Sequence, residues 1–436
     1  MSRIIVAGAG HGGLTAAYHL AKNGFDVTVI EKRKRADLGH DWHDWMTYDA
    51  FDKADLPRPD EDIVYETEPQ SFRNPSGSVN IQVPRDDISI VMDRKELINY
   101  LVELAEKAGA RLQFETKIIA PYTEGNTVKG IIIRKPRSVK ILEADLVIDS
   151  AGMYSPIRSK LPALFNIDNT IDKRSIFHVY RAYFENTTGE VNDPPYTINM
   201  FHMYRPGLDW TITTKDYVDV LLGKFSQAGE LTQEEIDAAI AAFREDYPFT
   251  GEKIVRGGVK ADIPISRMLA LIVANGYAAI GDAAGMTVPL NGSGIVLSME
   301  AGKILADTVL GADGDYSVNK LWNYEYEYYQ QYGKDLVVID IIKTVFTYVG
   351  GDVVDYIFEK GIMNAEMLGI ASGNPVKLTP DYVLNAIKSS PPLLKYVPAV
   401  AKCAKTAPLV SAVSTKMPKE YDEKKVARWI KAYKAL

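Results

Sequence analysis

The first 31 residues constrain the fold of this chain more than any other stretch does. An apolar segment, a glycine turn, a helical pattern, a second apolar segment and an acidic residue follow one another at residues 3–8, 8–13, 14–23 and 27–30 and at Glu31. The turn holds glycines with the G-x-G-x-x-G spacing, which are Gly8, Gly10 and Gly13. A strand–turn–helix–strand unit with this turn predicts a Rossmann-type dinucleotide site.

Each part of this motif has a physical task. Gly8 lets the chain turn sharply, Gly10 lets a pyrophosphate approach the backbone, and Gly13 lets the helix pack close to the strand. The helix N-terminus offers free N–H groups to the phosphates, and Glu31 lies where an acid accepts the ribose hydroxyls. The alternative is a glycine-rich turn in an ordinary α/β protein. The motif alone does not distinguish FAD from NAD.

Length and composition set further limits. A chain of 436 residues is long enough for two or three domains, and a net charge of −7 gives no general attraction to nucleic acid. The one cysteine, Cys403, excludes an internal disulfide, a dithiol relay and a cysteine-rich metal site. We expect it to be a small buried side chain. Without a signal peptide or an apolar stretch of about 18 residues, the expected setting is cytoplasmic.

Two kinds of pattern alternate along the chain. Short apolar runs and helical patterns predict a Rossmann-type cofactor-binding domain made of residues 1–70, 88–165 and 265–330. Long alternating runs predict an inserted antiparallel β-sheet domain for the substrate, made of residues 71–87 and 166–264, with strands at 176–184, 197–204, 210–213 and 217–225. Residues 331–436 are mostly helical by pattern, with breaks at Gly350–Gly351, Pro375, Pro391–Pro392 and Pro408. The predicted class is α/β.

Two imidazoles and two indoles are concentrated just after Glu31, at His40, Trp42, His43 and Trp45. We expect this segment to be a loop. It either packs its indoles and hydrogen-bonds its imidazoles, or it forms a wall that faces cofactor or substrate and carries a proton donor. Two histidines without a third ligand do not make a metal site, and none is predicted.

Four elements occur in order along the chain. They are the glycine turn with Glu31, Asp93–Arg94 at a predicted helix start, the segment 145–158, and Gly281-Asp-Ala-Ala-Gly285 with the glycine loop after it. As a set, over about residues 1–330, they resemble the FAD-dependent oxidoreductase superfamily of aromatic hydroxylases and geranylgeranyl reductases. The nearest likeness is to geranylgeranyl reductases, which share Ala-Ala-Tyr-His-Leu-Ala-Lys at residues 16–22. The resemblance implies that the cofactor is FAD.

The resemblance also implies roles for single residues. Arg94 would reach the pyrophosphate as a bidentate cation, and Asp282 would bind the ribityl chain or a water on the pyrophosphate. The loop after Pro289 would pass the pyrimidine end of the flavin, and the helix from Ile295 would direct its positive end at N1 and O2. The full set of predicted FAD-binding residues is Gly8, Gly10, His11, Gly12, Gly13, Glu31, Lys32, Arg94, Ala151, Gly152, Gly281, Asp282, Pro289, Gly292, Ser293, Gly294 and Ile295.

Two departures from the family pattern bear on the reaction. Ala151–Gly152 stands where the superfamily usually has Asp-Gly, which weakens the hydroxylase interpretation, although Asp149 lies nearby. The Tyr-x-Trp-x-Phe-Pro substrate motif of geranylgeranyl reductases is reduced to Trp210, and the Trp-x-Trp-x-Ile-Pro of flavin halogenases to Trp210 and Ile212. Both the standard prenyl substrate and halogenation are therefore disfavoured. Trp210 is either a core residue of the sheet or part of a pocket wall.

We therefore predict an FAD-dependent oxidoreductase that reduces a carbon–carbon double bond of an apolar, lipid- or isoprenoid-like substrate by hydride transfer from reduced flavin. One alternative is a flavin-dependent monooxygenase. Another, from a different class, is a flavin-carrying electron-transfer subunit without activity of its own. The candidate catalytic side chains are His40, His43, His202, Tyr204 and Trp210.

The electron donor is left open by the sequence. Because no second G-x-G-x-x-G occurs, electrons would come from transiently bound NAD(P)H or from a protein donor. Residues 422–436 carry an apolar stripe that consists of Val426, Trp429, Ile430 and Tyr433. Basic residues surround this stripe. This helix either docks on its own domain or contacts a membrane surface or an acidic electron donor.

Overall fold

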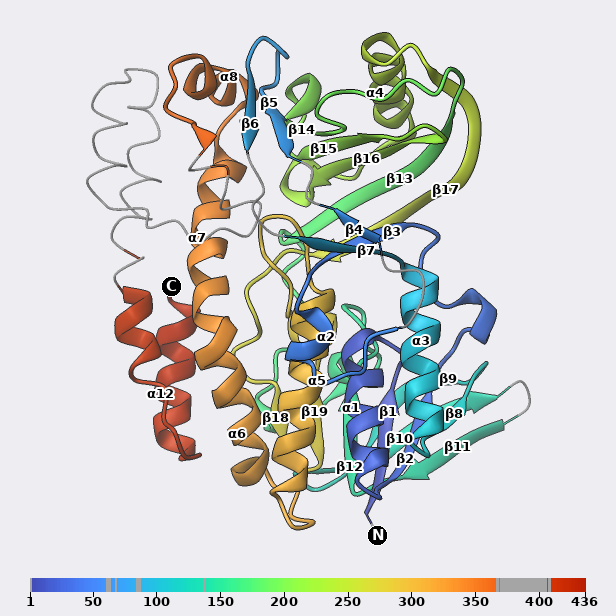
Figure 1. The fold of residues 1–436 in the computed structure, drawn as a ribbon. Coiled ribbons are helices and arrows are strands. Elements are labelled where there is room, and N and C mark those ends of the chain that lie inside the picture. The colour runs from blue at the N-terminus through green and yellow to red at the C-terminus, as the bar shows by residue number, and fades with distance from the viewer. Residues whose placement is uncertain are drawn as a thin grey trace.

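The structure is a computed structural model, and it describes residues 2–59, 64–66, 69–83, 88–135, 138–365, 368, 406 and 409–436 (Figure 1). Cys403 and the predicted breaks at Pro375, Pro391–Pro392 and Pro408 lie outside these residues. The predicted class is confirmed: a Rossmann-type sheet, a large second sheet and a helical C-terminal region are present.

The Rossmann-type sheet has the strand order β18-β19-β12-β1-β2-β8. Its strands are Val273–Ala274, Tyr277–Ala279, Leu146–Asp149, Arg3–Ala7, Asp26–Ile30 and Arg111–Gln113, in that order. The pairs are parallel except between β18 and β19. The central strands β1 and β12 are buried on both faces, which explains why their sequences are continuous apolar runs rather than alternating ones.

Three helices lie side by side against this sheet: α3 (Arg94–Lys107), α1 (His11–Lys22) and α5 (Ile295–Leu310). Helix α1 begins at His11, three residues before the predicted start, because Gly10 is its N-cap. Glycines make the contact between α1 and α5 possible. A Cβ on Gly12 would lie 2.5 Å from the Ser298 carbonyl oxygen, and one on Gly302 would lie 2.5 Å from the Gly12 carbonyl oxygen.

Two small antiparallel sheets accompany the first domain. One is the meander β11-β10-β9 (Ser138–Glu143, Thr127–Lys135 and Lys117–Glu124), whose Val128, Ile131 and Ile133 enter the main core. The other is β3-β7-β4 (His43–Thr47, Ser89–Asp93 and Val64–Glu66). The expectation of a loop at 40–45 is therefore wrong from His43 onwards, because β3 pairs with β7 in the register His43–Asp93 to Thr47–Ser89.

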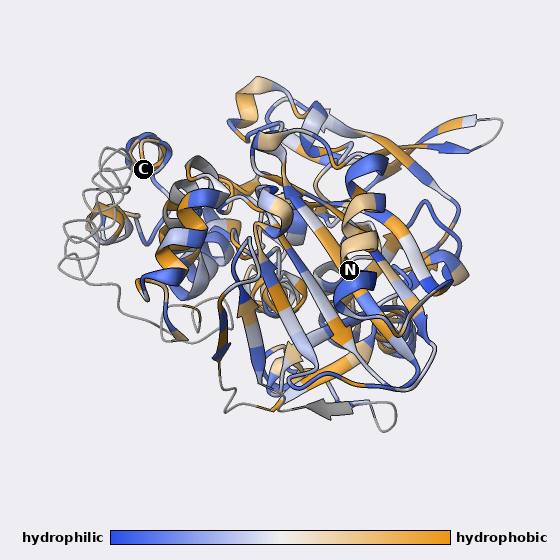
Figure 2. Ribbon diagram, turned by 90° about the horizontal axis from the view of Figure 1, so that it is seen from above, coloured by the Kyte–Doolittle hydropathy of each residue, from blue (hydrophilic) through white to orange (hydrophobic). Residues whose placement is uncertain are grey.

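The large sheet has the order β17-β13-β16-β15-β14-β5-β6. Its strands are Thr250–Pro264, Ile176–Asn186, Tyr217–Phe225, Leu208–Thr213, Tyr196–Met200, Gln70–Arg73 and Asn80–Val83. Hydrophobic and hydrophilic residues alternate along its strands, as the bands of Figure 2 show. The predicted strand 197–204 ends at Met200, because Phe201, Met203 and Tyr204 adopt left-handed backbone angles.

Helix α4 (Gln233–Asp246) covers one face of the large sheet and begins at a capping box formed by Thr232 and Glu235. Its Ile236, Ala239 and Phe243 pack on Tyr180, Ala182 and Phe184 of β13. Because side chains alternate along a strand, Val179, Arg181 and Tyr183 point to the other face. That second face meets the small sheet β3-β7-β4 and residues Val354 and Phe358 of the C-terminal region.

The C-terminal region consists, where described, of α6 (Val318–Tyr328), a π-helical turn (Tyr329–Gly333), α7 (Lys334–Tyr348), α8 (Gly351–Glu359) and α12 (Glu423–Lys434). In the N-terminal part of the chain, a short helix, α2 (Ala50–Lys53), packs against α5. The apolar stripe of α12 is buried on the first domain: Trp429 and Tyr433 pack on Tyr329, and the Tyr433 hydroxyl donates to the Met268 carbonyl. None of the described helices is long and apolar enough to cross a bilayer.

A buried carboxyl group on α6 gives the fold a pH dependence. Glu325 is fully buried, accepts a hydrogen bond from the Ile272 amide at 3.0 Å, and has no described partner on its other oxygen. Burial raises the pKa of Glu325 to about 8. The folded protein therefore holds a proton that the unfolded chain releases near pH 4.5, so this contribution to stability is lost as pH rises toward 8.

We expect Glu325→Gln to remove this fall in the free energy of unfolding at rising pH. The neutral amide still accepts the Ile272 hydrogen bond, so the variant should gain up to about 4 kcal/mol over the native protein between pH 5 and pH 9. Urea unfolding at a series of pH values measures the difference. Parallel stability curves for the two proteins would show that Glu325 is ionised in the fold at neutral pH.

Candidate cofactor and active site

The glycine turn rests directly on the turn that follows β12. Gly8 has φ +97°, and a Cβ there would lie 2.5 Å from the Ser150 carbonyl oxygen. Added Cβ atoms on Gly10 and Gly13 would lie 2.8 Å and 2.6 Å from the Ser150 side chain. Two loops from distant parts of the sequence thus approach so closely that only glycine fits at these positions.

The first helix turn leaves its donors free for a ligand. Gly10, the N-cap of α1, offers no side-chain cap, and the first turn of α1 contains no acidic residue. Such a helix end binds the phosphates of a dinucleotide through its N–H groups. The Glu31 carboxylate is held in place by the Ala9 and Arg33 amides at 3.0 and 2.8 Å. It retains lone pairs for the ribose hydroxyls, while Lys32 beside it is exposed.

His11 is the clearest sign that this loop holds a ligand. Its Nε2 atom is buried and lacks a hydrogen-bond partner among the described residues. Burial, helped by the charge of Arg94, lowers the pKa of His11 to about 4, so the ring is neutral at pH 7. An orphaned polar atom costs free energy unless a bound molecule or water satisfies it. The donors of α1 and His11 therefore fit a dinucleotide.

The turn after β12 is held by two residues, Asp149 and Tyr277, whose structural role the sequence did not indicate. Asp149 is fully buried and accepts hydrogen bonds from the Ala151 amide, the Ser155 hydroxyl and the Tyr277 hydroxyl at 3.1, 2.5 and 3.0 Å. Burial raises its pKa, and those hydrogen bonds oppose the shift. Asp149 therefore points into the fold and cannot replace the acid missing at Ala151. The signal for Tyr277 was only its place in a buried strand.

Arg158 joins this turn to the Gly281–Ala284 segment. It is 1% exposed and donates to the carbonyls of Met153 and Ala283, the latter at 2.5 Å. Gly281 has φ +63°, which lets the segment turn after β19. Burial raises the pKa of Asp282, and the charge of Arg94 partly opposes that rise. The Gly281–Ala284 segment packs against α1 and α5, next to the helix that starts at the glycine turn.

The loop before α5 brings the remaining predicted cofactor residues together. The Val288 amide donates to the Ser293 carbonyl at 2.8 Å, and the Gly292 amide donates to the Val288 carbonyl at 2.9 Å. Pro289 is buried inside this tight loop, and Ser293 is exposed. Gly294, the N-cap, has no capping side chain, so the N–H groups from Ile295 onwards remain available to an acceptor such as a flavin oxygen.

The candidate catalytic residues are not all brought together. The His202 Nδ1 atom lies 2.9 Å from Asp209, and its ring stacks on Phe243 of α4, on the side of the sheet away from the first domain. The exposed Tyr204 donates to Asp355 of α8 at 2.7 Å. His40, His43 and Trp210 lie on the other side, so the five residues do not form one site.

His43 is held between the two domains. Its Nε2 atom lies 2.9 Å from Nη1 of Arg256, its Nδ1 atom lies 3.3 Å from the Tyr217 hydroxyl, and its amide donates to the Tyr183 hydroxyl at 2.8 Å. A guanidinium can only donate, so Nε2 accepts and Nδ1 carries the proton. Burial and Arg256 lower the pKa of His43, which keeps the ring neutral.

Sequence reasoning missed Arg181, which sits under this network. It is 3% exposed and forms a bidentate ion pair with Asp219 at 2.9 and 2.5 Å. Its guanidinium lies 5.2–5.8 Å from the ring centres of Trp42, Trp45, Tyr183 and Trp210. Trp210 is therefore part of an aromatic box around a buried cation. Only the alternation along β13 could have indicated an inward-pointing arginine.

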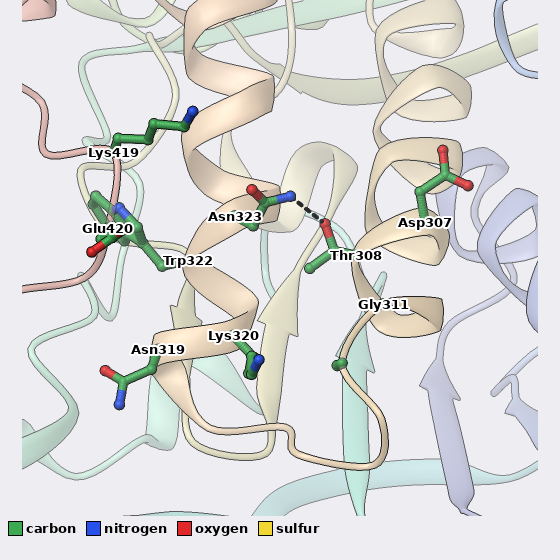
Figure 3. Close-up of a pocket in the computed structure, with 10 residues that line it drawn as sticks. Asp307, Thr308, Gly311, Asn319, Lys320, Trp322, Asn323, Lys419 and Glu420 are labelled. Carbon is green, nitrogen blue, oxygen red and sulfur yellow. Dashed lines mark hydrogen bonds between the residues drawn. The ribbon is translucent and has the colours of Figure 1, made fainter.

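One pocket lies away from the glycine turn and the loop before α5. Figure 3 shows a pocket of about 300 Å³ between the end of α5, α6 and residues 419–420, where Asn323 donates to Thr308 at 3.4 Å. Its helical residues Asp307 and Thr308 are near the opposite end of α5 from Ile295, about 18–20 Å away by helix rise. Within the described ranges, no three His, Cys, Asp or Glu side chains come together to hold a metal ion.

The fold is that of FAD-dependent oxidoreductases, and the chain resembles geranylgeranyl reductases. The cofactor is FAD, as predicted. Residues 6–80 match the NAD(P)-binding Rossmann-like domain, whose glycine turn also serves flavin dinucleotides.

Curated relatives make the likeness more specific. The chain is 25% identical over 380 residues to the digeranylgeranylglycerophospholipid reductase of Sulfolobus acidocaldarius, covering 85% of this chain and 82% of the relative. It is 26% identical over 420 residues to the enzyme of the same name from Methanocaldococcus jannaschii, covering 90% and 96%. The predicted resemblance to geranylgeranyl reductases is confirmed.

Solved structures agree at the level of the fold. A geranylgeranyl bacteriochlorophyll reductase-like protein from Thermoplasma acidophilum has a TM-score of 0.73 at 21% identity, covering 91% of this chain and 98% of its own. The myxobacterial chondrochloren halogenase CndH has a TM-score of 0.61 at 16% identity, covering 100% and 97%.

The role of Glu31 can be tested through cofactor affinity. In Glu31→Gln a single amide oxygen replaces two carboxylate oxygens, and the new NH2 group faces a backbone N–H. We expect the affinity for FAD to fall about tenfold, equivalent to about 1.4 kcal/mol. Flavin fluorescence titration of the apoprotein measures it, with the exposed Asp37→Asn as control. Equal affinity in Glu31→Gln and native protein would remove Glu31 from the adenosine site.

Proposed function

We propose that this protein is an FAD-dependent reductase that saturates carbon–carbon double bonds in an isoprenoid chain of a lipid. The observation that carries the proposal is the combination of a glycine turn that fits a dinucleotide with similarity, along most of both chains, to relatives named digeranylgeranylglycerophospholipid reductase. The departure from the family's substrate motif at Leu208–Thr213 changes side chains on β15 and leaves the strand in place.

Apolar surface next to the predicted flavin loop supports a hydrocarbon substrate. A Cβ on Gly292 would lie 2.6 Å from Ile263 of β17, so the loop touches the large sheet there. Ile263 packs against the apolar cluster on the sheet face away from α4, whose buried members include Phe72, Phe177, Val179, Leu221, Phe225, Val354 and Phe358. A hydrocarbon chain that contacts this cluster would lie within reach of the loop that passes the flavin.

Bound FAD, once reduced, would supply the hydride, and the protein must exclude water and hold a proton for the second carbon of the double bond. We propose the pair Tyr217 and His43 for the proton. Arg256 donates to Nε2 of His43, which makes its Nδ1–H a stronger donor to the Tyr217 oxygen. That donor stabilises the phenolate formed when the Tyr217 hydroxyl gives up its proton.

Electrons reach the flavin from NAD(P)H or a protein donor in this proposal. Since the apolar stripe of α12 packs on its own domain, the helix would meet a donor or an anionic membrane surface only through its exposed basic face. That face consists of Lys424, Lys425, Arg428 and Lys431. The contact would be electrostatic and sensitive to salt.

The main experiment measures double-bond reduction directly. The FAD-loaded protein, reduced anaerobically with dithionite, is mixed with a digeranylgeranyl glycerophospholipid in detergent. We expect flavin reoxidation and a lipid product that has gained hydrogen, seen by mass spectrometry. An oxygenated product formed only in air would indicate a monooxygenase instead. Reversible flavin reduction without any lipid conversion would indicate an electron carrier.

The proton-holding pair makes a separate prediction. Tyr217→Phe removes the hydroxyl and keeps the ring, so kcat should fall by about 10²–10³ with FAD affinity unchanged. The solvent deuterium isotope effect on kcat should be larger in the variant than in the native protein, because slower proton transfer then limits turnover. Native kcat in Tyr217→Phe would exclude this tyrosine as the donor.

A further inference from the structure

The short strand β3 lies beside the start of α3, where Arg94 is the first helical residue. The family resemblance implied that Arg94 reaches the FAD pyrophosphate, and the sequence left residues 40–45 as either a packed loop or a wall that faces cofactor or substrate. The contacts of Arg94 decide where this segment belongs. Arg94 is about one-fifth exposed, with a side-chain exposure of 22%, so most of it faces other residues or the cofactor space.

Asp44 holds one edge of the Arg94 guanidinium. Nε donates to Oδ2 and Nη2 donates to Oδ1, each at 2.5 Å. Asp44 is itself 9% exposed, so this ion pair is largely shielded from solvent. A guanidinium has two edges that can each bind an oxyanion through two N–H groups. Asp44 uses the Nε/Nη2 edge, which leaves the Nη1/Nη2 edge.

Trp42 holds the face of the same guanidinium. The centre of its ring lies 4.9 Å from the Cζ atom of Arg94, and its carbonyl accepts the Arg94 amide at 3.0 Å. Trp42 is 3% exposed, and His40 stacks on it at 4.3 Å. These contacts already restrict the rotamers of Arg94. Binding a ligand would therefore cost less side-chain entropy than it would with a freely rotating arginine.

The free edge belongs to the space around the glycine turn. Nη1 makes no hydrogen bond to any residue that the structure describes. The groups that feel the charge of Arg94 come from three other segments: His11 in the first turn of α1, Asp282 after β19, and His40. The buried Nε2 of His11, also without a described partner, borders the same space.

We infer that Asp44 and Trp42 are positioning residues that present the Nη1/Nη2 edge of Arg94 to the FAD diphosphate, so that β3 is part of the cofactor site. Two N–H groups in one plane match two oxygens of a phosphate, as they match a carboxylate. Glycine-turn amides alone would bind the diphosphate without a cation. This inference rests on the proposed function only in assuming that the protein binds FAD.

The sign of the effect of Asp44→Asn separates this role from a general charge effect. If Asp44 acted only as a nearby negative charge, its removal would strengthen binding of an anion. If it orients Arg94, the Asn amide places an NH2 group against one of the two guanidinium donors, the guanidinium turns, and binding weakens.

The test is a binding measurement on the apoprotein with FAD, ADP and adenosine as ligands. We expect Asp44→Asn to weaken FAD and ADP about tenfold each and to leave adenosine, which has no phosphate, unchanged. Asp52→Asn is the matched control, because Asp52 forms a similar two-bond pair with Arg58 on the exposed surface of α2. It should leave all three affinities unchanged.

A second variant keeps the test decisive if Asp44→Asn folds poorly, which a thermal melt would reveal. Arg94→Lys retains the charge and loses the second donor edge, so it should show the same tenfold loss for FAD and ADP. Equal or tighter ADP binding in a folded variant overturns the inference. Native protein that binds no FAD at all would instead overturn the proposed function.

Discussion

The close approach between the glycine turn and the Ser150 turn is the contact on which the rest of the site depends. Side chains at Gly8, Gly10 or Gly13 would collide with Ser150. The contact sets the end of β1 against the end of β12, and a second glycine contact, between Gly12 and Gly302, sets α1 against α5. Two helix N-termini therefore face the same space, one suited to phosphates and one to a flavin oxygen.

A second set of contacts fixes the large sheet over this site. Arg256 of β17 bonds to Asp93, Asp41 and His43, and Arg181 of β13 donates to the His43 carbonyl at 2.8 Å. These charges are paired and partly buried. Removing one partner would therefore leave the other charge unpaired in a low-dielectric interior, which destabilises the fold. The sheet face is divided by this network into a charged part near β3 and an apolar part near Ile263 and α8.

The cofactor end was the most predictable part of the protein. Gly8, Gly10, Gly13 and Glu31 have a fixed spacing because one turn of backbone must meet one phosphate group. In the structure, the Gly281–Ala284 segment packs against α1 and α5. The environment of Arg94 was not predictable. Its partner Asp44 reaches it only because β3 pairs with β7, and a five-residue strand carries no signal that distinguishes it from a loop.

The sequence by itself determined the fold class and the order of the elements, because these follow from local spacing and periodicity, whereas FAD was implied by the family resemblance. Tertiary structure decided which candidate side chains share a site. It separated His202 and Tyr204 from His43, turned Asp149 into the fold, and buried the stripe of α12 on its own domain. The physical reason is that side-chain partners are set by strand pairing and helix packing between segments far apart in the chain, which no local pattern records.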